Sequence, residues 1–502
     1  MAKTLPPEIL FHIADYLNSP DCVVALPKYA LVCRQWQAVF EPLIYKTLCV
    51  HSSSFRTGKG TISLSHFESL VSGSQHRIAR RGMIQDIKYT VIVPYDLPDY
   101  KSSIIRDHPG GYTRDNPIRH ANDEAFHDGV VDLFNILTSW KERHCLGISP
   151  RILGREQQYE PGTEFCPSAR EYAEIPRGNK WVVRPYRARF PEDKSNLPDV
   201  SCIHQLIFED YGNEDETSHI WPGTALSIAR SCPMLHEFYW HTFDFIRPDH
   251  LDYMQERRQA LAEGLTNLPS TLRMFDYHGL SEQAYHDSGS APILIQGNLD
   301  LFSVNLRPIT LCLQELNLAG IAVSLDFLLP LDQDGKPIAL CMEWPSLKRI
   351  KIETTNYLPS GEWFFDPTPE EDESNTIAHF NDSASEDSYD TQLVVLEEIP
   401  YERSELRVEM CHRAYISLGY AAQHMPRLTS IEYLLPLQPG TEFRFSKDQV
   451  SGNATITWET GSMYEPDKRV AEAWGYQLDD MEFLVKDPPM WPTVRLPCWP
   501  PL

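Results

Sequence analysis

The chain has 502 residues, of which 42% are hydrophobic and 23% charged, the composition of a globular protein. Its 45 Lys and Arg against 70 Asp and Glu leave a net charge of −25. This charge argues against general binding of nucleic acid or anionic membranes, which attract positive patches. We therefore expect protein partners, and the length predicts several domains or one core extended by repeats.

The cysteines and the apolar runs indicate the compartment. Eleven cysteines are spread singly without a Cys-x-x-Cys pair, which predicts reduced thiols in an intracellular compartment. No apolar run approaches the roughly 20 residues that a membrane-spanning helix needs, and charged residues interrupt the N-terminal stretch where a signal peptide would be apolar. Cys498 is fifth from the end, whereas prenylation needs the fourth position. We expect a soluble protein in the cytoplasm, the nucleus or both.

The first fifty residues form a separate helical pattern. Apolar residues recur at helical spacing after Pro6 and Pro7, which predicts an amphipathic helix over 6–17. After a turn signal at 18–21, a second helical stretch carries a broad apolar stripe at Leu31, Val32, Trp36, Val39, Phe40 and Leu43. Two or three short helices fit this segment. Such a unit buries too little surface to be robust alone, so we expect it to pack on a partner or on the rest of the chain.

Two short motifs carry a resemblance. LPPEIL at 5–10 and LVCRQW at 31–36 occur in order, and together this segment resembles the F-box. The resemblance implies a docking module for the small Skp adaptor of SCF-type ubiquitin ligases and, through the adaptor, for a cullin. The positions that match are Leu5, Pro6, Glu8, Ile9, Leu10, Ile13, Leu17, Val32, Cys33 and Trp36.

One departure concerns the middle of this segment. The spacing from Asp21 to Cys33 is longer than in the usual motif, and Pro27 interrupts it, so the middle helix would be displaced. The alternative is a helical cap on the following domain. We expect an adaptor-docking module at 1–48 and a second region at 49–502.

The second region repeats a Leu-x-x-apolar-x-apolar pattern. It begins at Leu235, Leu272, Leu313, Leu347 and Leu428, and more loosely at Ile203. Successive starts lie 32, 37, 41, 34 and 81 residues apart. Helices are predicted at 124–143, 221–231, 250–266 and 415–425. Short strands alternating with helices suggest a right-handed stack with a parallel sheet.

We therefore expect an α/β fold in which a helical F-box precedes an irregular leucine-rich-repeat-like solenoid. The repeats are longer than the 20 to 29 residues usual for that class, and an α/β domain of unrelated elements is the alternative. With the N-terminal motifs, EPLIYKTLCV at 41–50 and WPSLKRIKI at 344–352, the chain resembles fungal F-box proteins with a long leucine-rich-repeat-like region.

The strand faces predict a surface for a protein substrate. A curved stack presents one strand face as an extended binding surface. The outward positions are Glu237, Tyr239, Asp276, Glu315, Asn317, Arg349, Lys351 and Glu432. From these we select Tyr239, Glu315, Asn317, Arg349 and Lys351 as the candidate substrate contacts. No Lys or Arg occurs between Ile352 and Arg403, so we expect a mobile acidic insertion at 367–391. The insertion is either a plain solvated loop or a site where phosphate at Ser383 or Ser385 tunes partner binding.

The common signatures of chemistry are missing. The sequence contains no phosphate-binding loop, dinucleotide turn, His-Glu-x-x-His pair or Gly-x-Ser-x-Gly elbow. Its eighteen histidines are scattered without a close metal-like cluster, so neither a metal nor another cofactor is expected. The leading interpretation is a non-catalytic substrate-recognition subunit of an SCF-type ligase. The alternatives are an interaction scaffold that recruits no cullin and an enzyme with an unrecognised pocket.

Overall fold

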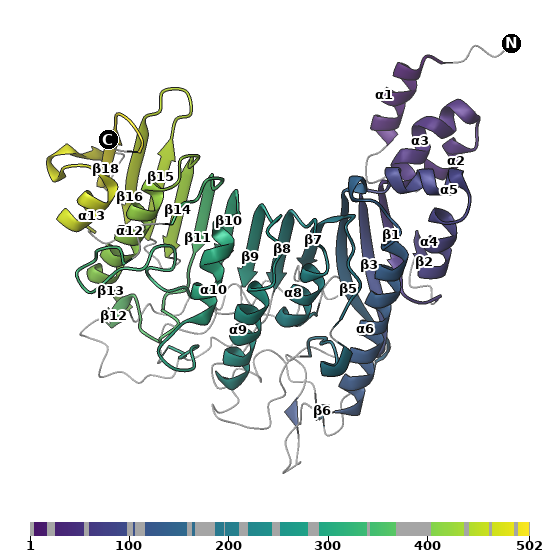
Figure 1. The fold of residues 1–502 in the computed structure, drawn as a ribbon, viewed down its shortest axis with the longest axis horizontal. Helices are drawn as coiled ribbons and strands as arrows, with labels where there is room; N and C mark the ends of the chain where they lie inside the picture. The colour runs from purple at the N-terminus through teal and green to yellow at the C-terminus, as the bar shows by residue number, and fades with distance from the viewer. Residues whose placement is uncertain are drawn as a thin grey trace, which may run out of the picture. The chain divides into compact units, whose positions relative to one another are not determined.

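Figure 1 shows the computed structural model of the chain as a ribbon. The chain forms two compact units. The first comprises Met1–Trp240 with Asn267–Leu272, and the second His241–Thr266 with Arg273–Leu502. The structure describes residues 5–17, 26–54, 60–97, 104–105, 116–157, 163–165, 186–194, 196–209, 219–242, 251–279, 291–338, 342–367, 403–435, 441–460, 464–485 and 490–500. The acidic insertion expected at 367–391 therefore lies, apart from residue 367, outside the described residues.

The first unit alternates helices with mostly parallel strands. Its helices are α1 (Pro7–Leu17), α2 (Leu26–Ala30), α3 (Arg34–Lys46), α4 (Leu64–Val71), α5 (Gln75–Arg80), α6 (Pro117–Leu137) and α8 (Pro222–Arg230). Its strands are β1 (Thr47–His51), β2 (Thr61–Ser63), β3 (Asp86–Asp96), β4 (Ile104–Ile105), β5 (Leu146–Gln157), β6 (Thr163–Phe165), β7 (Ile203–Glu209) and most of β8 (Glu237–Thr242). The last two residues of β8, His241 and Thr242, belong to the second unit. The order β2-β1-β3-β5-β7-β8 forms the sheet of this unit, and the pairs from β2 to β7 are parallel.

Helix α6 covers the sheet of the first unit at close range. Asn116 caps it by accepting a hydrogen bond of 2.8 Å from the Ile118 amide, and Pro117 occupies the first turn, where its missing N–H costs nothing. Tyr89 of β3 donates its hydroxyl to the carbonyl of Gly129. A Cβ at Gly129 would meet Val91 at 2.8 Å, so only glycine allows this approach. The cap explains why the helix begins earlier than the predicted 124.

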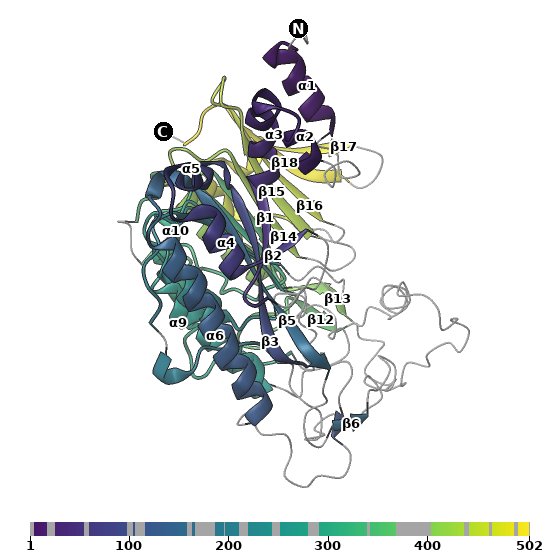
Figure 2. The same ribbon diagram turned by 90° about the vertical axis from the view of Figure 1, so that its right-hand side faces the viewer.

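The second unit holds most of the predicted repeats. Its helices are α9 (Leu251–Leu265), α10 (Leu301–Thr310), α12 (Val408–Gln423) and α13 (Lys468–Trp474). Its strands are β9 (Met274–Gly279), β10 (Glu315–Ala319), β11 (Arg349–Glu353), β12 (Phe365–Pro367), β13 (Arg403–Leu406), β14 (Ser430–Leu435), β15 (Thr441–Lys447), β16 (Ala454–Thr460), β17 (Met481–Val485) and β18 (Met490–Leu496). Figure 2 shows α9 and α10 together on one side of these strands.

Four parallel strands of this unit keep a single register. Leu316 pairs with Phe275 of β9 on one side and with Ile350 of β11 on the other, and Ile350 pairs with Ile431 of β14. The side chains of this row are at most 1% exposed. The leading residues Leu272, Leu313, Leu347 and Leu428 are equally buried. Every segment with the predicted pattern is a strand, including β7 and β8, because alternate apolar residues fill the interior under the helices.

The strands after β14 depart from the expected parallel sheet. β15, β16, β18 and β17 follow β14 in that order, and each neighbouring pair is antiparallel. The expectation of a parallel sheet throughout 49–502 is therefore wrong for residues 441–496. Their buried core is aromatic, with Phe443 stacked 4.9 Å from Tyr415 of α12.

The predicted helices exist with shifted ends. Those at 221–231 and 250–266 are confirmed as α8 and α9, whereas the one at 415–425 begins at Val408. The helix at 124–143 ends at Leu137, and a short 3-10 turn, Glu142–His144, follows. None of the helices among the described residues has the length and apolarity needed to cross a membrane.

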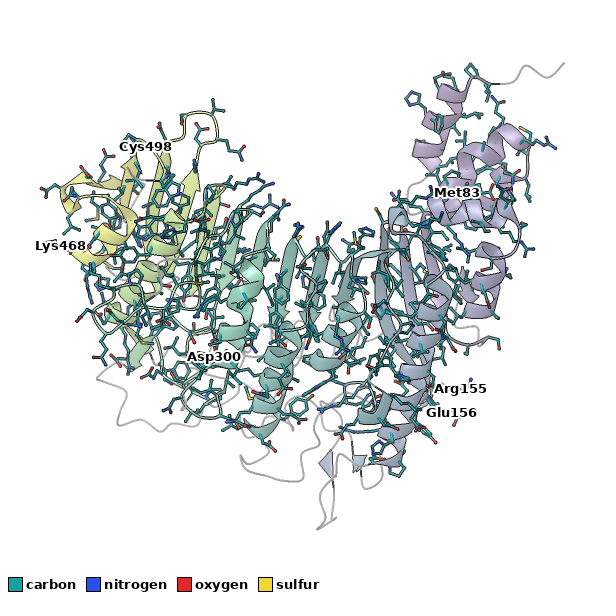
Figure 3. All side chains as sticks on the ribbon, in the orientation of Figure 1. Met83, Arg155, Glu156, Asp300, Lys468 and Cys498 are labelled. Atoms are coloured by element: carbon teal, nitrogen blue, oxygen red, sulfur yellow. The ribbon has the colours of Figure 1, made fainter. Side chains whose placement is uncertain are left out.

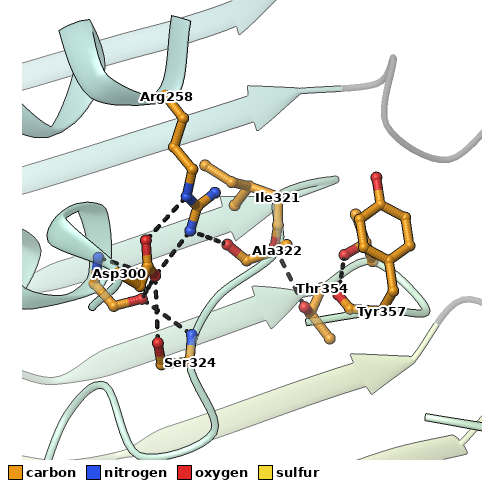
Figure 4. Close-up of polar contacts among 9 residues, drawn as sticks. Arg258, Asp300, Ile321, Ala322, Ser324, Thr354 and Tyr357 are labelled. Atoms are coloured by element: carbon orange, nitrogen blue, oxygen red, sulfur yellow. Dashed lines mark hydrogen bonds and ion pairs between the residues drawn. The ribbon is translucent and has the colours of Figure 1, made fainter. Parts of the chain in front are cut away.

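A buried polar network holds α9 to the start of α10 (Figure 4). Asp300, labelled in Figure 3, caps α10 and receives two hydrogen bonds from the Arg258 guanidinium. Nη2 of Arg258 also donates to the Ala322 carbonyl at 2.8 Å. The hydroxyls of Ser303 and Ser324 donate to the Asp300 carboxylate. The network gives hydrogen-bond partners to both members of a charge pair that would be costly to bury alone, although Nη1 of Arg258 has none.

Candidate functional site

The N-terminal helices enclose a small apolar core of their own. Its buried members are Leu10, Ala14, Leu26, Val39 and Phe40. Helical spacing brings the members of α1 and α3 to facing sides of the two helices, and Pro27 lies in the first turn of α2, where it is tolerated. Pro27 therefore starts a helix rather than interrupting one.

Three aromatic rings close this core on the side of α2. Trp36 stacks on Phe40 with ring centroids 5.4 Å apart, and Tyr29 lies 6.0 Å from Trp36 and 5.5 Å from Phe40. Phe40 is fully buried, whereas Trp36 is half-buried. Part of the Trp36 ring is thus available at the surface of the helical unit.

Large apolar side chains lie exposed around this core. Leu5 is 42% exposed, Ile9 45% and Val32 61%. Among the described residues, fourteen large hydrophobic side chains are exposed, and six of them fall within the first 32 positions: Leu5, Ile9, Phe11, Tyr16, Leu31 and Val32. Exposed apolar side chains are therefore more frequent in this segment than in the rest of the described chain.

Leu31 and Val32 owe their exposure to a turn. The sequence predicts them on the stripe of one helix, but the helix is broken between α2 and α3, and this prediction is wrong. The Leu31 and Val32 amides bond back to the carbonyls of Lys28 and Tyr29 at 3.3 and 3.2 Å. The turn presents both side chains to solvent next to Cys33, the residue that precedes α3.

The residues predicted to contact an adaptor divide into three groups by exposure. The exposed group consists of Leu5, Pro6, Glu8, Ile9, Val32 and Cys33, while Ile13, Leu17 and Trp36 are half-buried against the core. Leu10 is different because it is fully buried inside the core. Its side chain therefore supports the exposed residues around it from within the core.

Two polar contacts position this helical unit. Gln35 of α3 donates its side-chain amide to the Leu5 carbonyl at 3.1 Å, which ties the segment before α1 to α3. Glu41, a buried carboxylate of α3, receives a hydrogen bond of 3.0 Å from Arg80 of α5. Helix α3 is therefore anchored both to the N-terminal segment and to the residues that follow it. The division after residue 48 stays a prediction.

The predicted substrate contacts of the second unit lie on two paired strands. Glu315 and Asn317 of β10 pair in register with Arg349 and Lys351 of β11, and Arg349 forms an ion pair with Glu315. Arg349 and Lys351 are exposed, whereas Glu315 and Asn317 are half-buried. Because alternate residues share a face, the three charged side chains and Asn317 form one polar patch, which we call the β10–β11 patch.

Tyr239 lies in the first unit, on β8, and is half-buried. Its hydroxyl donates to Glu237 at 3.1 Å, and the same carboxylate oxygen accepts a hydrogen bond of 2.7 Å from Gln205. Its polar end is therefore engaged within the chain, and its ring remains partly accessible.

One cluster of potential metal ligands was not predicted from the sequence. His241 of β8 with Asp276 and His278 of β9 brings three potential metal-ligand atoms within 4.8 Å of one another, which corrects the conclusion that the histidines are scattered. The available signal was the alternation Asp276-x-His278 at the end of a predicted strand. This spacing alone does not predict a metal site, because the third residue, His241, comes from β8 and the sequence does not show that β8 and β9 are neighbours.

The charge of Asp276 is held by its surroundings. Burial alone would raise the pKa of this carboxyl, but hydrogen bonds from His241, His278 and Asn317 outweigh burial and leave the pKa well below its ordinary value. Asp276 is therefore an anion at neutral pH, although only 7% of the residue is exposed.

The N-terminal helices match a known family. The family model of the F-box-like domain matches residues 2–51, about a tenth of the chain. The match covers α1 to α3 with the exposed apolar residues around them. Neither the curated proteins nor the solved structures contain a match to the chain.

Proposed function

We propose that the chain is a substrate-recognition subunit of an SCF-type E3 ubiquitin ligase. The exposed apolar residues of the F-box-like unit would bind a Skp-type adaptor and, through it, a cullin. The observation that carries this proposal is the exposure of Ile9 and Val32 on an otherwise closed core. The surface gains free energy when a partner removes it from water.

The second region would hold a protein substrate. The constant register from β9 to β14 supports a leucine-rich-repeat-like arrangement of the kind expected from the resemblance to fungal F-box proteins. The β10–β11 patch is the place where we expect the substrate to bind, because it combines exposed charge with a rigid strand support. In this role the chain raises the local concentration of the substrate near a ubiquitin-loaded enzyme and needs no catalytic residue of its own.

Adaptor binding is tested with a matched pair of double variants. Ile9→Ala with Val32→Ala truncates two exposed apolar residues of the F-box-like unit, while Ile338→Ala with Val450→Ala truncates residues of the same types that are 68% and 96% exposed elsewhere. Hot-spot truncations cost about 2 kcal/mol or more. We expect the first variant to bind a purified Skp-type adaptor about 30-fold more weakly by calorimetry, and the second to bind like the wild type. Equal affinities for all three proteins would overturn the proposal.

A second experiment separates the ligase from a scaffold. The wild-type chain, bound to its adaptor, is mixed with the adaptor's cullin and passed over a sizing column. Formation of a ternary complex supports the ligase. An adaptor complex that excludes the cullin supports an interaction scaffold instead. The double variant Leu5→Ala with Pro6→Ala should remove the cullin together with the adaptor while leaving the rest of the chain folded.

A further inference from the structure

Two neighbouring strands end with histidines directed at one carboxylate. His241 and His278 are each the residue before the last of their strand, and Asp276 lies two positions before His278 on the same face of β9. The carboxyl ends of parallel strands are where α/β sheets commonly bind ligands. We propose that His241, Asp276 and His278 form a binding site for a first-row divalent transition-metal ion of the zinc class.

The distances fit such an ion. Asp276 Oδ1 lies 3.2 Å from Nε2 of His241 and 3.2 Å from Nε2 of His278. Tetrahedral zinc with ligands at their usual bond lengths places neighbouring ligand atoms about 3.3 Å apart. The two imidazole rings lie side by side, with centroids 4.3 Å apart. The ligand atoms of the three residues all lie within 4.8 Å of one another, so side-chain rotation has to close only the separation between the two imidazole nitrogens for all three atoms to share one coordination shell.

The chemistry of the ligands selects the class of ion. Two imidazoles with one carboxylate suit zinc and its first-row neighbours. Calcium and magnesium prefer shells of oxygen atoms, which this cluster does not supply. The carboxylate supplies one negative charge, so a divalent ion would leave a net charge of about +1 on the site.

Partial exposure keeps the site accessible. The side chains of His241 and His278 are 21% and 31% exposed, whereas that of Asp276 is 10% exposed. An ion can therefore enter from the side of the histidines, while the carboxylate is fixed behind them. Three protein ligands with an accessible side also leave room for a water molecule or a ligand atom from a bound molecule.

Asn317 positions the carboxylate. It pairs in register with Asp276 across β9 and β10, and its Nδ2 donates to Asp276 Oδ2 at 3.1 Å. This contact occupies one carboxylate oxygen and leaves Oδ1 for the ion, as outer-shell partners do in known metal sites. The same Nδ2 of Asn317 lies 3.1 Å from Nε2 of His278. The His278 ring therefore has to rotate for its Nε2 lone pair to face the ion.

The competing account is a hydrogen-bonded triad without metal, in which both histidines donate Nε2–H to Asp276. Zinc binding distinguishes the two accounts. The full-length chain is stripped with a chelator and titrated with Zn²⁺ against a chromophoric competitor, beside the double variant His241→Ala with His278→Ala. We expect one tight site per chain in the wild type and at least about tenfold weaker binding in the variant.

A second histidine pair, which belongs to no three-ligand cluster among the described residues, provides the matched control. The rings of His204 and His236 lie 5.0 Å apart in the first unit, and Nδ1 of His204 contacts the Cys202 carbonyl. His204→Ala with His236→Ala should bind zinc like the wild type. Equal zinc affinity of the wild type and the His241/His278 variant would overturn the proposal, as would an equal loss in the control.

A cobalt measurement on the wild type keeps the test decisive even where the variant fails to fold. Co²⁺ added to the stripped chain should give ligand-field absorption in the visible range at one equivalent, without a thiolate-to-cobalt charge-transfer band. The absence of ligand-field absorption would overturn the proposal. A charge-transfer band would do the same, because it would assign the ion to cysteines such as the exposed Cys33 or Cys145.

Discussion

Arg258 and Asp300 form a two-point ion pair in the interior of the second unit. Nε of Arg258 lies 2.9 Å from Oδ1 and its second terminal nitrogen 2.8 Å from Oδ2, and the two side chains are 7% and 5% exposed. Because the carboxylate also caps α10, the pair couples the charge balance of the core to the start of a helix.

Breaking this pair from one side should destabilise the chain strongly. Arg258→Met leaves Asp300 as a buried anion without its partner, which costs about 3–5 kcal/mol in comparable cases. Lys336→Met is the control, since the Lys336–Glu472 pair is about half exposed and should contribute at most about 1 kcal/mol. Urea unfolding followed by fluorescence measures both. Similar losses of unfolding free energy in the two variants would show that the buried pair contributes no more to stability than the exposed pair.

The stability contributed by Asp300 should depend on pH. Burial would raise the pKa of this carboxyl, but the charge of Arg258 and the hydrogen bonds from Arg258 and Ser303 lower it below the ordinary 3.8. A group with a lowered folded-state pKa stabilises the protein above its unfolded-state pKa and loses that contribution as pH falls.

The difference in unfolding free energy between the wild type and Asp300→Asn should therefore be constant from about pH 5 to 7 and narrow below about pH 4. Urea titrations at each pH measure this difference. The control variant Asp334→Asn, at an exposed position, should have the same free energy of unfolding as the wild type at each pH. A difference that widens on acidification would contradict the assigned direction of the pKa shift.

Two neighbouring residues of α1 should separate folding from binding. Leu10→Ala opens a cavity in the N-terminal core and should destabilise that unit by about 2–5 kcal/mol. Ile9→Ala removes a side chain that is 45% exposed, so it should change stability little and weaken adaptor binding. Hydrogen exchange of α1 to α3 reports the first effect and calorimetry with the adaptor the second. An equal loss of protection from hydrogen exchange in both variants would show that Ile9 supports the core as Leu10 does.

The packing of α12 on α13 depends on a single glycine. A Cβ at Gly419 would meet Trp474 at 2.7 Å and the Ala473 carbonyl at 2.9 Å, while the Trp474 indole donates to the Tyr415 carbonyl. Gly419→Ala should therefore cost about 1–3 kcal/mol through overpacking. Gly82→Ala, with no atom within 4 Å of its Cβ, is the control and should be close to neutral. Thermal unfolding distinguishes the two.

The sequence is most informative where a pattern and a local structure have the same period. Leu272 and Leu313 lead the strands β9 and β10 because a buried leucine followed by alternating apolar residues suits a strand covered by a helix. The amphipathic spacing of α1 is equally local. These elements could be predicted from neighbouring residues alone.

The remainder depends on contacts between distant segments. His241 and Asp276 are 35 residues apart in the chain and meet only because β8 and β9 are neighbours. The antiparallel direction of β15 to β18 is set by pairing, which a single strand does not encode. Leu31 and Val32 have helical spacing with Trp36, but the backbone turn between α2 and α3 overrides it.

The register shared by β9, β10, β11 and β14 leaves the lengths of their connections free. Phe275, Leu316, Ile350 and Ile431 stand in one row although 41, 34 and 81 residues separate them along the chain. Loop closure becomes only slowly more costly as a connection grows. Insertions and deletions between these strands can therefore accumulate over evolution without disturbing the ladder, so relatives of this chain should vary in length there while keeping the row itself apolar.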